Sequence, residues 1–395
     1  MPRPGAASHS ASATRGCWRA TCCPRFRTSC TCFGKAVSKT NLRWADIDLR
    51  AVRANAARIL AHVPHGTRVM AVVKANGYGH GAVQVARAAL AGGATWLATS
   101  TLEEANELTG LVHPEHILVM GGLVPEQAAA AAANGFVIGV SSLEFARALE
   151  DGDEVVPVHL KVDTGMGRFG ASPTEAASLA EFIDRSAGLR LAGTWTHFAS
   201  AGTDEAMTRA QFDRFMNVLD RLGFDPGIRH VCNSAATLRY PQMALDAVRT
   251  GIALYGCEWP GAAPALALRS VVTHVKSLPK GGTVGYGALW SAPSPARVAT
   301  VAIGYADGVH RARGNRGDVL VRGRRASLIG AVSMDAITVD VSDVDGVAVG
   351  DVVTIIGPDG DERITAEEVA TWSNTICYEV LTAIGPRVKR LYLPT

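Results

Sequence analysis

Short runs of apolar residues alternate with amphipathic stretches along most of the chain after residue 41. Stretches of helical periodicity, such as 83–92 and 205–223, separate the runs. Near-continuous apolar strands divided by helices are typical of a parallel sheet whose outer face is covered. Eight β/α units predict a (β/α)8 TIM-type barrel. The eight runs are 68–73, 95–100, 116–122, 136–142, 156–162, 191–198, 229–234 and 245–252.

A doubly wound dinucleotide-binding fold is the main alternative for such an alternation. That fold places a glycine-rich GxGxxG turn after its first strand, and no such turn follows residues 68–73. The barrel is therefore favoured, with a further helix predicted ahead of it at 49–61.

The pattern changes near residue 269, where short β-type segments are divided by Gly, Pro and Asp turns and one helix is expected at 365–373. This pattern of short strands and turns predicts a C-terminal, mostly antiparallel β domain. We divide the chain into an extension at 1–40 that we expect to be disordered, a barrel at 41–268 and the β domain at 269–395. The β-type segments are 270–278, 296–305, 317–323, 326–333, 336–341 and 351–357.

Composition changes this picture only at the N-terminus. The chain has 395 residues, of which 48% are hydrophobic and 19% charged, and no run of 18 or more apolar residues, so we expect no membrane partner. Seven of the 39 Lys and Arg lie in residues 1–40, which contain no Asp or Glu. The remainder has 32 basic against 36 acidic residues, so the net charge of +3 does not favour a nucleic-acid partner.

Five of the eight cysteines also lie in residues 1–40, with no histidines at zinc-finger distances, so we expect no metal site there or elsewhere. The other three, Cys232, Cys257 and Cys377, are scattered, which favours a reducing, cytoplasmic compartment. The N-terminal region has no apolar segment typical of a secretion signal; a transit peptide is the alternative to an extension.

Residues at the carboxyl ends of barrel strands line the active site in this fold. Two lysines, two arginines and a histidine are predicted to meet there, which indicates a cationic, anion-binding mouth. The residues that this rule selects are Lys74, Lys161, Arg168, His197, Asn233, Ser234, Arg249 and Gly251.

Lys74 follows an apolar run, so desolvation and cationic neighbours are expected to lower its pKa and free the amine for covalent attachment to a carbonyl cofactor. A solvated lysine at a strand end is the alternative. Arg249 lies inside an apolar strand and needs a partner, either a cofactor ring nitrogen or a buried carboxylate. His197 either stacks on an aromatic cofactor or is a packed polar residue. Ser234 and the backbone near Gly251 suit a phosphate.

The motifs AVVKANGYGHG (71–81), KVDTGMGRFG (161–170), VRTGIALYG (248–256), VGYG (284–287) and IGYADG (303–308), together with YEVLTAIGPRVKRLY (378–392), resemble the alanine racemase family over about residues 41–395. One departure is Ser333, where many members have cysteine. The resemblance implies the same barrel and β domain, and a head-to-tail homodimer whose active sites are shared between subunits.

The resemblance also implies roles for individual residues. Lys74 would hold pyridoxal 5'-phosphate covalently and act as one catalytic base, and Tyr286 of the partner subunit would act as the other. The implied cofactor contacts are Tyr78, His197, Asn233, Ser234, Arg249, Gly251, Ile252 and Tyr378, with His197 on the pyridine ring and Arg249 at its nitrogen. The implied substrate contacts are Arg168, Tyr305, Met334 and Asp335, with Lys161 a possible site of carbamylation.

The implied function is the interconversion of L-alanine and D-alanine, which supplies D-alanine for bacterial peptidoglycan. We expect His197 and Arg249 to be cations beside the second base. Racemisation of another small amino acid such as serine stays open, because a small pocket rejects one extra hydroxyl only modestly. A fold-related decarboxylase and a non-catalytic cofactor-binding protein are further alternatives, and the VGYG tyrosine and the long β domain count against them respectively.

Overall fold

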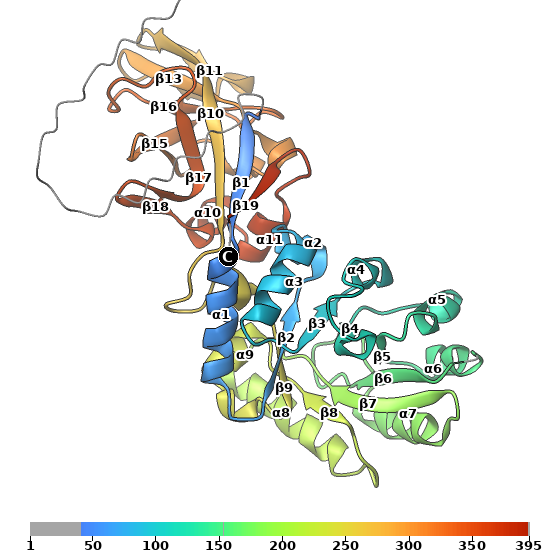
Figure 1. The fold of residues 1–395 in the computed structure, drawn as a ribbon. Helices are drawn as coiled ribbons and strands as arrows, with labels where there is room; N and C mark the ends of the chain where they lie inside the picture. The colour runs from blue at the N-terminus through green and yellow to red at the C-terminus, as the bar shows by residue number, and fades with distance from the viewer. Residues whose placement is uncertain (1–40, 153, 394–395) are drawn as a thin grey trace, which may run out of the picture. The chain divides into compact units, whose positions relative to one another are not determined.

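Eight parallel strands close into a barrel in the computed structural model, which describes residues 41–152 and 154–393 (Figure 1). All eight coincide with predicted apolar runs, so the barrel is confirmed. The final strand pairs with the first, where Met70 lies opposite Arg249. The strands are β2 (Arg68–Val72), β3 (Trp96–Thr99), β4 (Ile117–Val119), β5 (Val137–Val140), β6 (Val156–Lys161), β7 (Leu189–Trp195), β8 (Ile228–His230) and β9 (Ala247–Thr250).

Helices connect the strands and bury one face each. In α7 the buried residues Ala176, Leu179, Ala180 and Ile183 recur at helical spacing, and Ser172 with Glu175 forms a capping box. The helix predicted at 49–61 is present as α1. The helices of this part are α1 (Leu49–His62), α2 (Lys74–Tyr78), α3 (Ala82–Ala91), α4 (Leu102–Asn106), α5 (Ala128–Ala132), α6 (Leu143–Glu150), α7 (Pro173–Arg185), α8 (Glu205–Leu219) and α9 (Ser234–Arg239).

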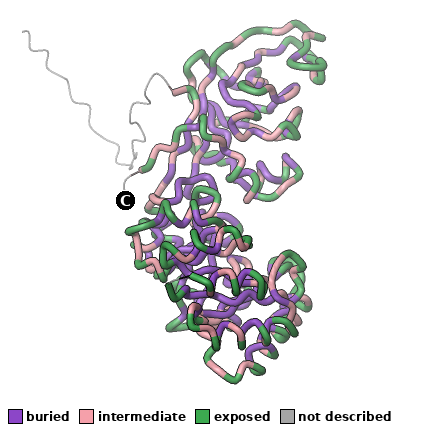
Figure 2. Tube along the Cα trace, turned by 90° about the vertical axis from the view of Figure 1, so that its right-hand side faces the viewer, coloured by how far each residue is buried: buried purple, intermediate pink, exposed green. Residues whose placement is uncertain are grey.

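The barrel strands are buried on both faces, which explains why they read as continuous apolar runs instead of alternating ones. All residues of β3, β5, β6 and β9 are buried. Figure 2 shows this burial as continuous purple segments through the strands. The interior also contains polar residues such as Lys161 and Arg249, and these need a separate explanation.

A nine-stranded sheet forms the second part of the fold, and all its pairings except one are antiparallel, as predicted. Its pairings β10–β13–β16–β15–β14–β17–β10 close a ring of six strands. The six strands are β10 (Leu266–Leu278), β13 (Ala296–Val301), β14 (Asp318–Val321), β15 (Arg324–Ile329), β16 (Ile337–Asp340) and β17 (Val352–Asp359), and β18 (Glu362–Ile364) extends β17. Two short strands, β11 (Thr283–Val284) and β12 (Trp290–Ser291), pair separately.

The first and last strands complete this second sheet. Strand β1 (Arg43–Asp48) pairs antiparallel with β10 and parallel with β19 (Lys389–Leu393). The sequence analysis assigned all residues from 41 to 268 to the barrel, yet β1 hydrogen-bonds in the C-terminal sheet. The division at residue 268 stays a prediction. Helices α10 (Ala366–Ser373) and α11 (Cys377–Thr382) precede β19.

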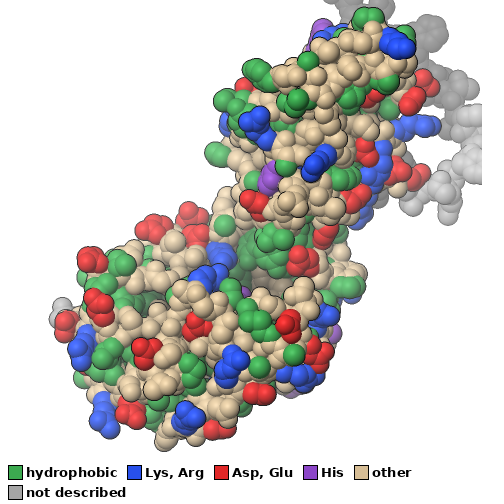
Figure 3. All heavy atoms as spheres, turned by 180° about the vertical axis from the view of Figure 1, so that it is seen from behind, with side chains coloured by type: hydrophobic (Ala, Val, Ile, Leu, Met, Phe, Trp, Pro, Cys, Tyr) green, Lys and Arg blue, Asp and Glu red, His purple; other side chains and the backbone are tan. Residues whose placement is uncertain are grey.

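None of the helices in the described part of the chain is both long and apolar enough to cross a membrane. On the face drawn in Figure 3, basic and acidic side chains are interspersed. This mixture agrees with the near balance of charges after residue 40. The predicted extension at 1–40 lies outside the described residues.

Candidate active site

Lys74 lies two residues after the end of β2, as the first residue of α2, and the backbone that follows it is left-handed. Ala75, Asn76, Gly77 and Tyr78 all have φ between 50° and 60°. A left-handed conformation costs an L-residue roughly 1–2 kcal/mol, and glycine and asparagine tolerate it best. Such a run persists only where surrounding contacts determine it, and strain of this kind clusters at functional sites.

Several hydrogen bonds hold this left-handed turn. The Asn76 side-chain oxygen accepts from Ala82 N at 3.0 Å, and Ala75 N donates to a Glu104 carboxylate oxygen at 2.6 Å. The other Glu104 oxygen accepts from Ser100 N at 2.8 Å. Glu104 thus ties the turn to the end of β3, and it was not among the residues selected from the sequence. The Lys74 side chain is half-buried, and burial together with Arg168 lowers its pKa.

A turn held by Ser234 follows the end of β9. The Ser234 hydroxyl oxygen accepts from Gly251 N at 3.0 Å and from Ala253 N at 3.3 Å. Gly251 leads into the 3₁₀ helix η4 (Ile252–Tyr255). A Cβ atom added to Gly251 would lie 2.4 Å from the Tyr78 hydroxyl, so glycine is needed for this approach. The turn therefore gathers backbone N–H groups and two hydroxyls beside a helix start, a combination that suits phosphate.

Asn233 acts locally, because its side chain caps α9 by accepting from Ala236 N at 3.0 Å. Tyr378, at the start of α11, packs its ring 6.0 Å from that of Tyr78. The Tyr378 hydroxyl donates to Glu258 at 3.3 Å, and burial and that carboxylate raise its pKa. Burial raises the pKa of Tyr78 to about 12, so both hydroxyls are proton donors near neutral pH.

Arg249 is buried in β9, and the structure answers one question that the sequence left open. No carboxylate pairs with Arg249 among the described residues. Its guanidinium instead donates to the carbonyl oxygens of Thr196 at 2.8 Å and His230 at 2.9 Å, and to the His230 ring at 2.7 Å. Burial lowers its pKa to about 9. Its Nε–H has no acceptor within the described part of the chain, which leaves a buried donor for a ligand.

A buried histidine pair, His159 and His230, extends from Arg249 into the barrel and was missed from the sequence. His159 Nδ1 and His230 Nε2 are 2.8 Å apart. Because arginine only donates, His230 Nδ1 must accept, and its Nε2–H then donates to His159. Burial and Arg249 lower the pKa of His159 to about 3 and that of His230 well below its ordinary value. Both rings are neutral and hold Arg249 in place.

His197 is neutral, which corrects the expectation that it is a cation. Its ring nitrogen Nδ1 lies 3.2 Å from Arg249, which donates to it. Burial, Arg249 and Arg168 move its pKa well below the ordinary value. The prediction failed because several cationic side chains lie close together here, and each positive charge disfavours the protonated form of its neighbours.

Lys161, the last residue of β6, is 1% exposed, and its Nζ has no hydrogen-bond partner among the described residues. The ammonium lies 3.0 Å from the Phe169 ring centroid and 4.6 Å from that of Trp195. Burial, Arg168 and Arg249 lower its pKa to about 7. A large part of this amine is therefore uncharged and nucleophilic at neutral pH.

Arg168 lies on the loop after β6, and Asp163 fixes that loop. The Asp163 carboxylate accepts from the backbone N–H groups of Gly165, Met166 and Gly167 at 2.8 to 3.2 Å. The Arg168 guanidinium is exposed and lies 5.4 Å from the Phe169 ring centroid. It is the accessible cation of the mouth, and its charge lowers the pKa of Lys74, Lys161 and His197.

The other predicted site residues lie in the C-terminal sheet region. Tyr286 is 76% exposed, Met334 51% and Tyr305 41%. Tyr305 N donates to Ser333 O at 3.0 Å, which joins the Tyr305 and Met334 loops. The Ser333 side chain takes no part in this backbone contact. No hydrogen bond of the described residues links Tyr286, Tyr305 or Met334 to Lys74.

Asp307 fixes these loops and was also missed. It is fully buried and pairs with Arg43 at 2.8 Å and Arg387 at 2.9 Å. Arg387 pairs in turn with Asp335 at 2.6 Å. The IGYADG motif (303–308) could have pointed to Asp307, because a buried carboxylate in a turn needs a cation as its partner.

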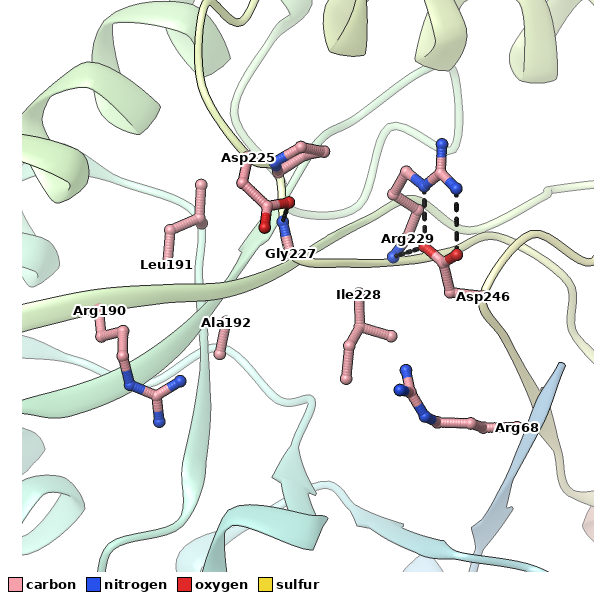
Figure 4. Close-up of a pocket in the computed structure, with 10 residues that line it drawn as sticks. Arg68, Arg190, Leu191, Ala192, Asp225, Gly227, Ile228, Arg229 and Asp246 are labelled. Atoms are coloured by element: carbon pink, nitrogen blue, oxygen red, sulfur yellow. Dashed lines mark hydrogen bonds and ion pairs between the residues drawn. The ribbon is translucent and has the colours of Figure 1, made fainter. Parts of the chain in front are cut away.

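A cavity of about 560 Å³ lies at the other end of the barrel, near the amino ends of β2, β7 and β8 (Figure 4). Two of its arginines are already paired: Arg229 binds Asp246 at 2.8 Å and Arg190 binds Glu115 at 2.8 Å. Since barrel enzymes work at the carboxyl ends of their strands, this cavity is not the active site.

The fold and the site together define a class of protein: a barrel with a half-buried lysine, a turn suited to phosphate and a cationic mouth at the carboxyl ends of its strands. Comparisons with known proteins give the particular family. The alanine racemase N-terminal domain matches residues 47–258 and the alanine racemase C-terminal domain matches residues 265–392. The chain belongs to the alanine racemase family, whose members depend on pyridoxal phosphate.

Individual relatives agree over nearly the full length. An alanine racemase of Desulforamulus reducens is 44% identical over 371 residues, covering 89% of this chain and 98% of the relative. The alanine racemase of Bacillus anthracis with bound L-Ala-P is 37% identical at a TM-score of 0.84, covering 91% and 97%. The enzyme of E. faecalis is 35% identical at a TM-score of 0.85, covering 91% and 100%.

Proposed function

We propose that this chain interconverts L-alanine and D-alanine with pyridoxal phosphate bound at Lys74, as a source of D-alanine for peptidoglycan. The observation that carries the proposal is the turn between Ser234 and Gly251. It follows β9, which pairs with β2, and Lys74 lies two residues after the end of β2. An aldehyde cofactor that carries a phosphate fits this pairing. The family assignment supports the same reaction.

The residues present fit the cofactor in two further respects. The close approach of Gly251 to the Tyr78 hydroxyl leaves room that a Cβ would fill, and the Ser234 hydroxyl and Ile252 N–H lie at the same turn. Arg249 Nε is a buried donor with no acceptor in the described part of the chain, as a pyridine nitrogen requires. Tyr378 completes the phosphate contacts and Asn233 positions Ser234 by capping α9.

When bound, pyridoxal phosphate withdraws electrons from the α carbon of the amino acid joined to it, which acidifies the α-proton. Lys74 Nζ takes or returns this proton on one face, and its lowered pKa favours the free amine that the task needs. Tyr286 Oη, from the partner subunit, serves the other face. Two bases on opposite faces allow the product to leave with inverted configuration.

Arg249 acts as a hydrogen-bond donor and not as an acid. Five contacts from the barrel interior hold its guanidinium, and the neutral pair His230 and His159 supplies no proton to it. A donor that keeps its proton weakens electron withdrawal at the ring. We infer that this suppresses transamination, and that Arg249→Glu raises pyruvate formation relative to racemisation.

Arg168 binds the substrate carboxylate and the cofactor's phenolic oxygen, since it is the exposed cation of the mouth. Lys161 is a candidate for carbamylation, because its pKa of about 7 supplies the free amine and its Nζ lacks a partner within the described chain. A carbamate there would be an anion that supports Arg168.

A head-to-tail homodimer brings the C-terminal residues to the site. Tyr286, Tyr305 and Met334 are large and exposed, and with Asp335 they would meet the partner's Lys74 mouth. Such a cluster of exposed side chains is typical of an interface. We place the enzyme in the cytoplasm, since Cys232, Cys257 and Cys377 are free thiols.

The test of the function is incubation of the purified holoenzyme with L-alanine and, separately, L-serine while optical rotation is followed. We expect optical rotation to be lost with L-alanine, and kcat/KM to be higher for L-alanine than for L-serine. Borohydride treatment followed by peptide mapping should find the cofactor on Lys74 in the wild type and not in Lys74→Ala. Lys276→Ala, an exposed lysine of β10, is the control. A colourless protein after reconstitution, or a label elsewhere, refutes the proposal.

The assignment of faces has its own test. Tyr286→Phe keeps the ring and removes the hydroxyl, so proton abstraction from L-alanine should fall by about 10²–10⁴-fold while abstraction from D-alanine falls less. Single-turnover exchange of the α-proton in ²H₂O measures both directions. Tyr240→Phe, outside the site, should change neither. Equal losses from both enantiomers contradict the assignment.

A further inference from the structure

Two of the buried cysteines lie together, and neither has a role in the proposed reaction. Cys257 follows η4, Cys377 opens α11, and Glu367 lies in the first turn of α10. One ligand atom from each of these three residues lies within 4.8 Å of the other two. Cys257 is 4% exposed and Cys377 2%, whereas the Glu367 carboxylate is exposed. The cluster therefore has two buried sulfurs and an open side.

Glu258 lies beside this cluster, in contact with two of its members. Its Oε1 accepts from the Cys377 thiol at 3.3 Å, and its backbone N–H donates to Glu367 Oε1 at 3.1 Å. Tetrahedral zinc binds sulfur at about 2.3 Å and carboxylate oxygen at about 2.0 Å, which sets sulfur and oxygen about 3.5 Å apart. The observed separation of Glu258 Oε1 from the Cys377 sulfur is close to that value.

The charge of the cluster is not balanced by protein groups. In the chain outside residues 1–40, 153 and 394–395, neither Glu258 nor Glu367 forms an ion pair with a Lys, Arg or His nitrogen. The adjacent Glu368, in contrast, pairs with Arg325 at 3.0 Å. Two carboxylates beside two thiols without a cation repel one another when the thiols ionise, and a divalent cation removes this cost.

We propose that Cys257, Cys377 and Glu367 form a structural zinc-type site that joins η4 to α10 and α11, and that the Glu258 carboxylate turns toward the ion from its place beside Cys377 to become the fourth ligand. The two thiolates and two carboxylates are the donors that such an ion accepts. A disulfide between the thiols is disfavoured, because neighbouring carboxylates suppress the thiolate that disulfide exchange needs. The site differs from the absence of metal expected from the sequence, where the cysteines looked scattered.

The position of the site gives it a structural role. Glu258 also accepts from Tyr378, and η4 contains Ile252, so the ion would fix the segment that carries the proposed phosphate contacts. Zinc that binds the native state alone stabilises it by mass action. The experiments below measure zinc binding and thermal stability, not racemisation. Their outcome is therefore independent of whether the proposed function is correct.

The experiment uses full-length holoenzyme in which the five tail cysteines, Cys17, Cys22, Cys23, Cys30 and Cys32, are replaced by serine. After dialysis with zinc and removal of excess, one ion per chain is expected. X-ray absorption should show two sulfurs at about 2.3 Å and two oxygens at about 2.0 Å. Cys257→Ser and Cys377→Ser should each weaken binding at least tenfold and abolish the zinc-dependent rise in Tm.

Two further variants keep the test decisive if a serine variant fails to fold. Glu367→Gln changes only an exposed carboxylate and should weaken zinc binding, whereas Cys232→Ala, which removes the buried cysteine outside the cluster, should not. Less than half an ion per chain, an absorption spectrum without sulfur ligands, binding unchanged in Cys257→Ser, or a Cys257–Cys377 disulfide in the purified protein would each overturn the proposal.

Discussion

At the scale of single residues, the mouth of the barrel is a set of cations that lower one another's pKa. Lys161 shows the effect most strongly, because it is buried between two aromatic rings and lies near Arg168 and Arg249. Removing an ammonium from water without a hydrogen-bonding partner favours its neutral form. The same crowding makes His197 neutral and lowers the pKa of Lys74.

Lys161→Met tests this environment through stability. The unfolded chain keeps the Lys161 proton up to a pH near 10.5, whereas the folded chain loses it near 7. Between these values the unfolded state binds more protons, so the free energy of unfolding of the wild type rises with pH. The methionine variant lacks this rise. Its gain in Tm over the wild type should therefore be largest at pH 7 and below and should shrink toward pH 10.

The measurement is thermal unfolding in carbon-dioxide-free buffer, since a carbamate would replace the cation. Lys276→Met, at an exposed position, should show no pH-dependent difference. A gain in Tm for Lys161→Met that is the same at pH 7 and pH 10 would contradict the proposed pKa.

Sequence reasoning located Lys74, Lys161 and Arg249 because charged residues at the ends of apolar runs are conspicuous. It did not find His159 and His230, because the sequence does not show which groups a histidine ring within a strand will contact. Glu104 was missed for a similar reason, since its bond to Ala75 joins two separate β/α units. The prediction of a cationic His197 failed because pKa values depend on all neighbours at once.

At the scale of elements, the left-handed turn of α2 and the turn before η4 place the reactive groups. Gly79 in the first has φ of 80°, and a Cβ there would lie 2.5 Å from Leu381 O in α11. The turn is thus fixed both by its own backbone and by the C-terminal helix against it.

Gly79→Ala should destabilise the protein more than Gly110→Ala. Both glycines have φ of 80°, but nothing lies within 4 Å of a Cβ at Gly110. The control should cost about 1 kcal/mol from its positive φ alone. Gly79→Ala should cost about 1–3 kcal/mol more, because the Leu381 carbonyl must move. Urea unfolding gives both values, and equal losses would show that the contact with α11 is unimportant.

Gly251→Ala tests the phosphate turn without the cost of a positive φ, because the φ of Gly251 is −110°. The added methyl would displace the Tyr78 hydroxyl and one proposed phosphate contact. Loss of one such contact costs about 1–3 kcal/mol, so the Kd for pyridoxal phosphate should rise about 10- to 100-fold. Equilibrium dialysis measures it. Gly202→Ala, whose Cβ would be 3.9 Å from the nearest atom, is the control; similar affinities for both variants contradict the assignment.

All eight barrel strands were predictable from sequence because burial on both faces makes each a distinct apolar run. The predicted ends were less accurate. The run at 191–198 was read through His197, whereas β7 ends at Trp195. Apolar residues continue past the strand into the loop that carries the site. Strands β1 and β19 were missed, since they pair with each other from opposite ends of the chain.

At the scale of the whole molecule, the described residues of one chain hold the two halves of a proposed site, and no hydrogen bond joins Lys74 to Tyr286. The Lys74 mouth has its phosphate turn and its cations, and Tyr286 stands 76% exposed on the C-terminal sheet region. Asp307, Arg387 and Asp335 hold the neighbouring loops in an ion-pair network. A second copy of the chain supplies the missing half of each site in the proposed homodimer.

The sequence pattern alone did not predict that the site is shared between two subunits. Periodicity reports on the fold of one chain, whereas an interface depends on the surfaces of two. The VGYG motif pointed to Tyr286 only through the family resemblance. Its exposure is the structural feature that supports an interface, and isolated subunits of this arrangement should have no complete site.

The most direct measurement co-expresses Lys74→Ala and Tyr286→Phe chains with different affinity tags and isolates the mixed dimer. If Lys74 of one subunit works with Tyr286 of the other, the mixed dimer has one intact site and one doubly altered site. Its rate of alanine racemisation should then be about half that of the wild type, although each variant alone is nearly inactive. A mixed dimer as inactive as its parents would contradict a site shared between subunits.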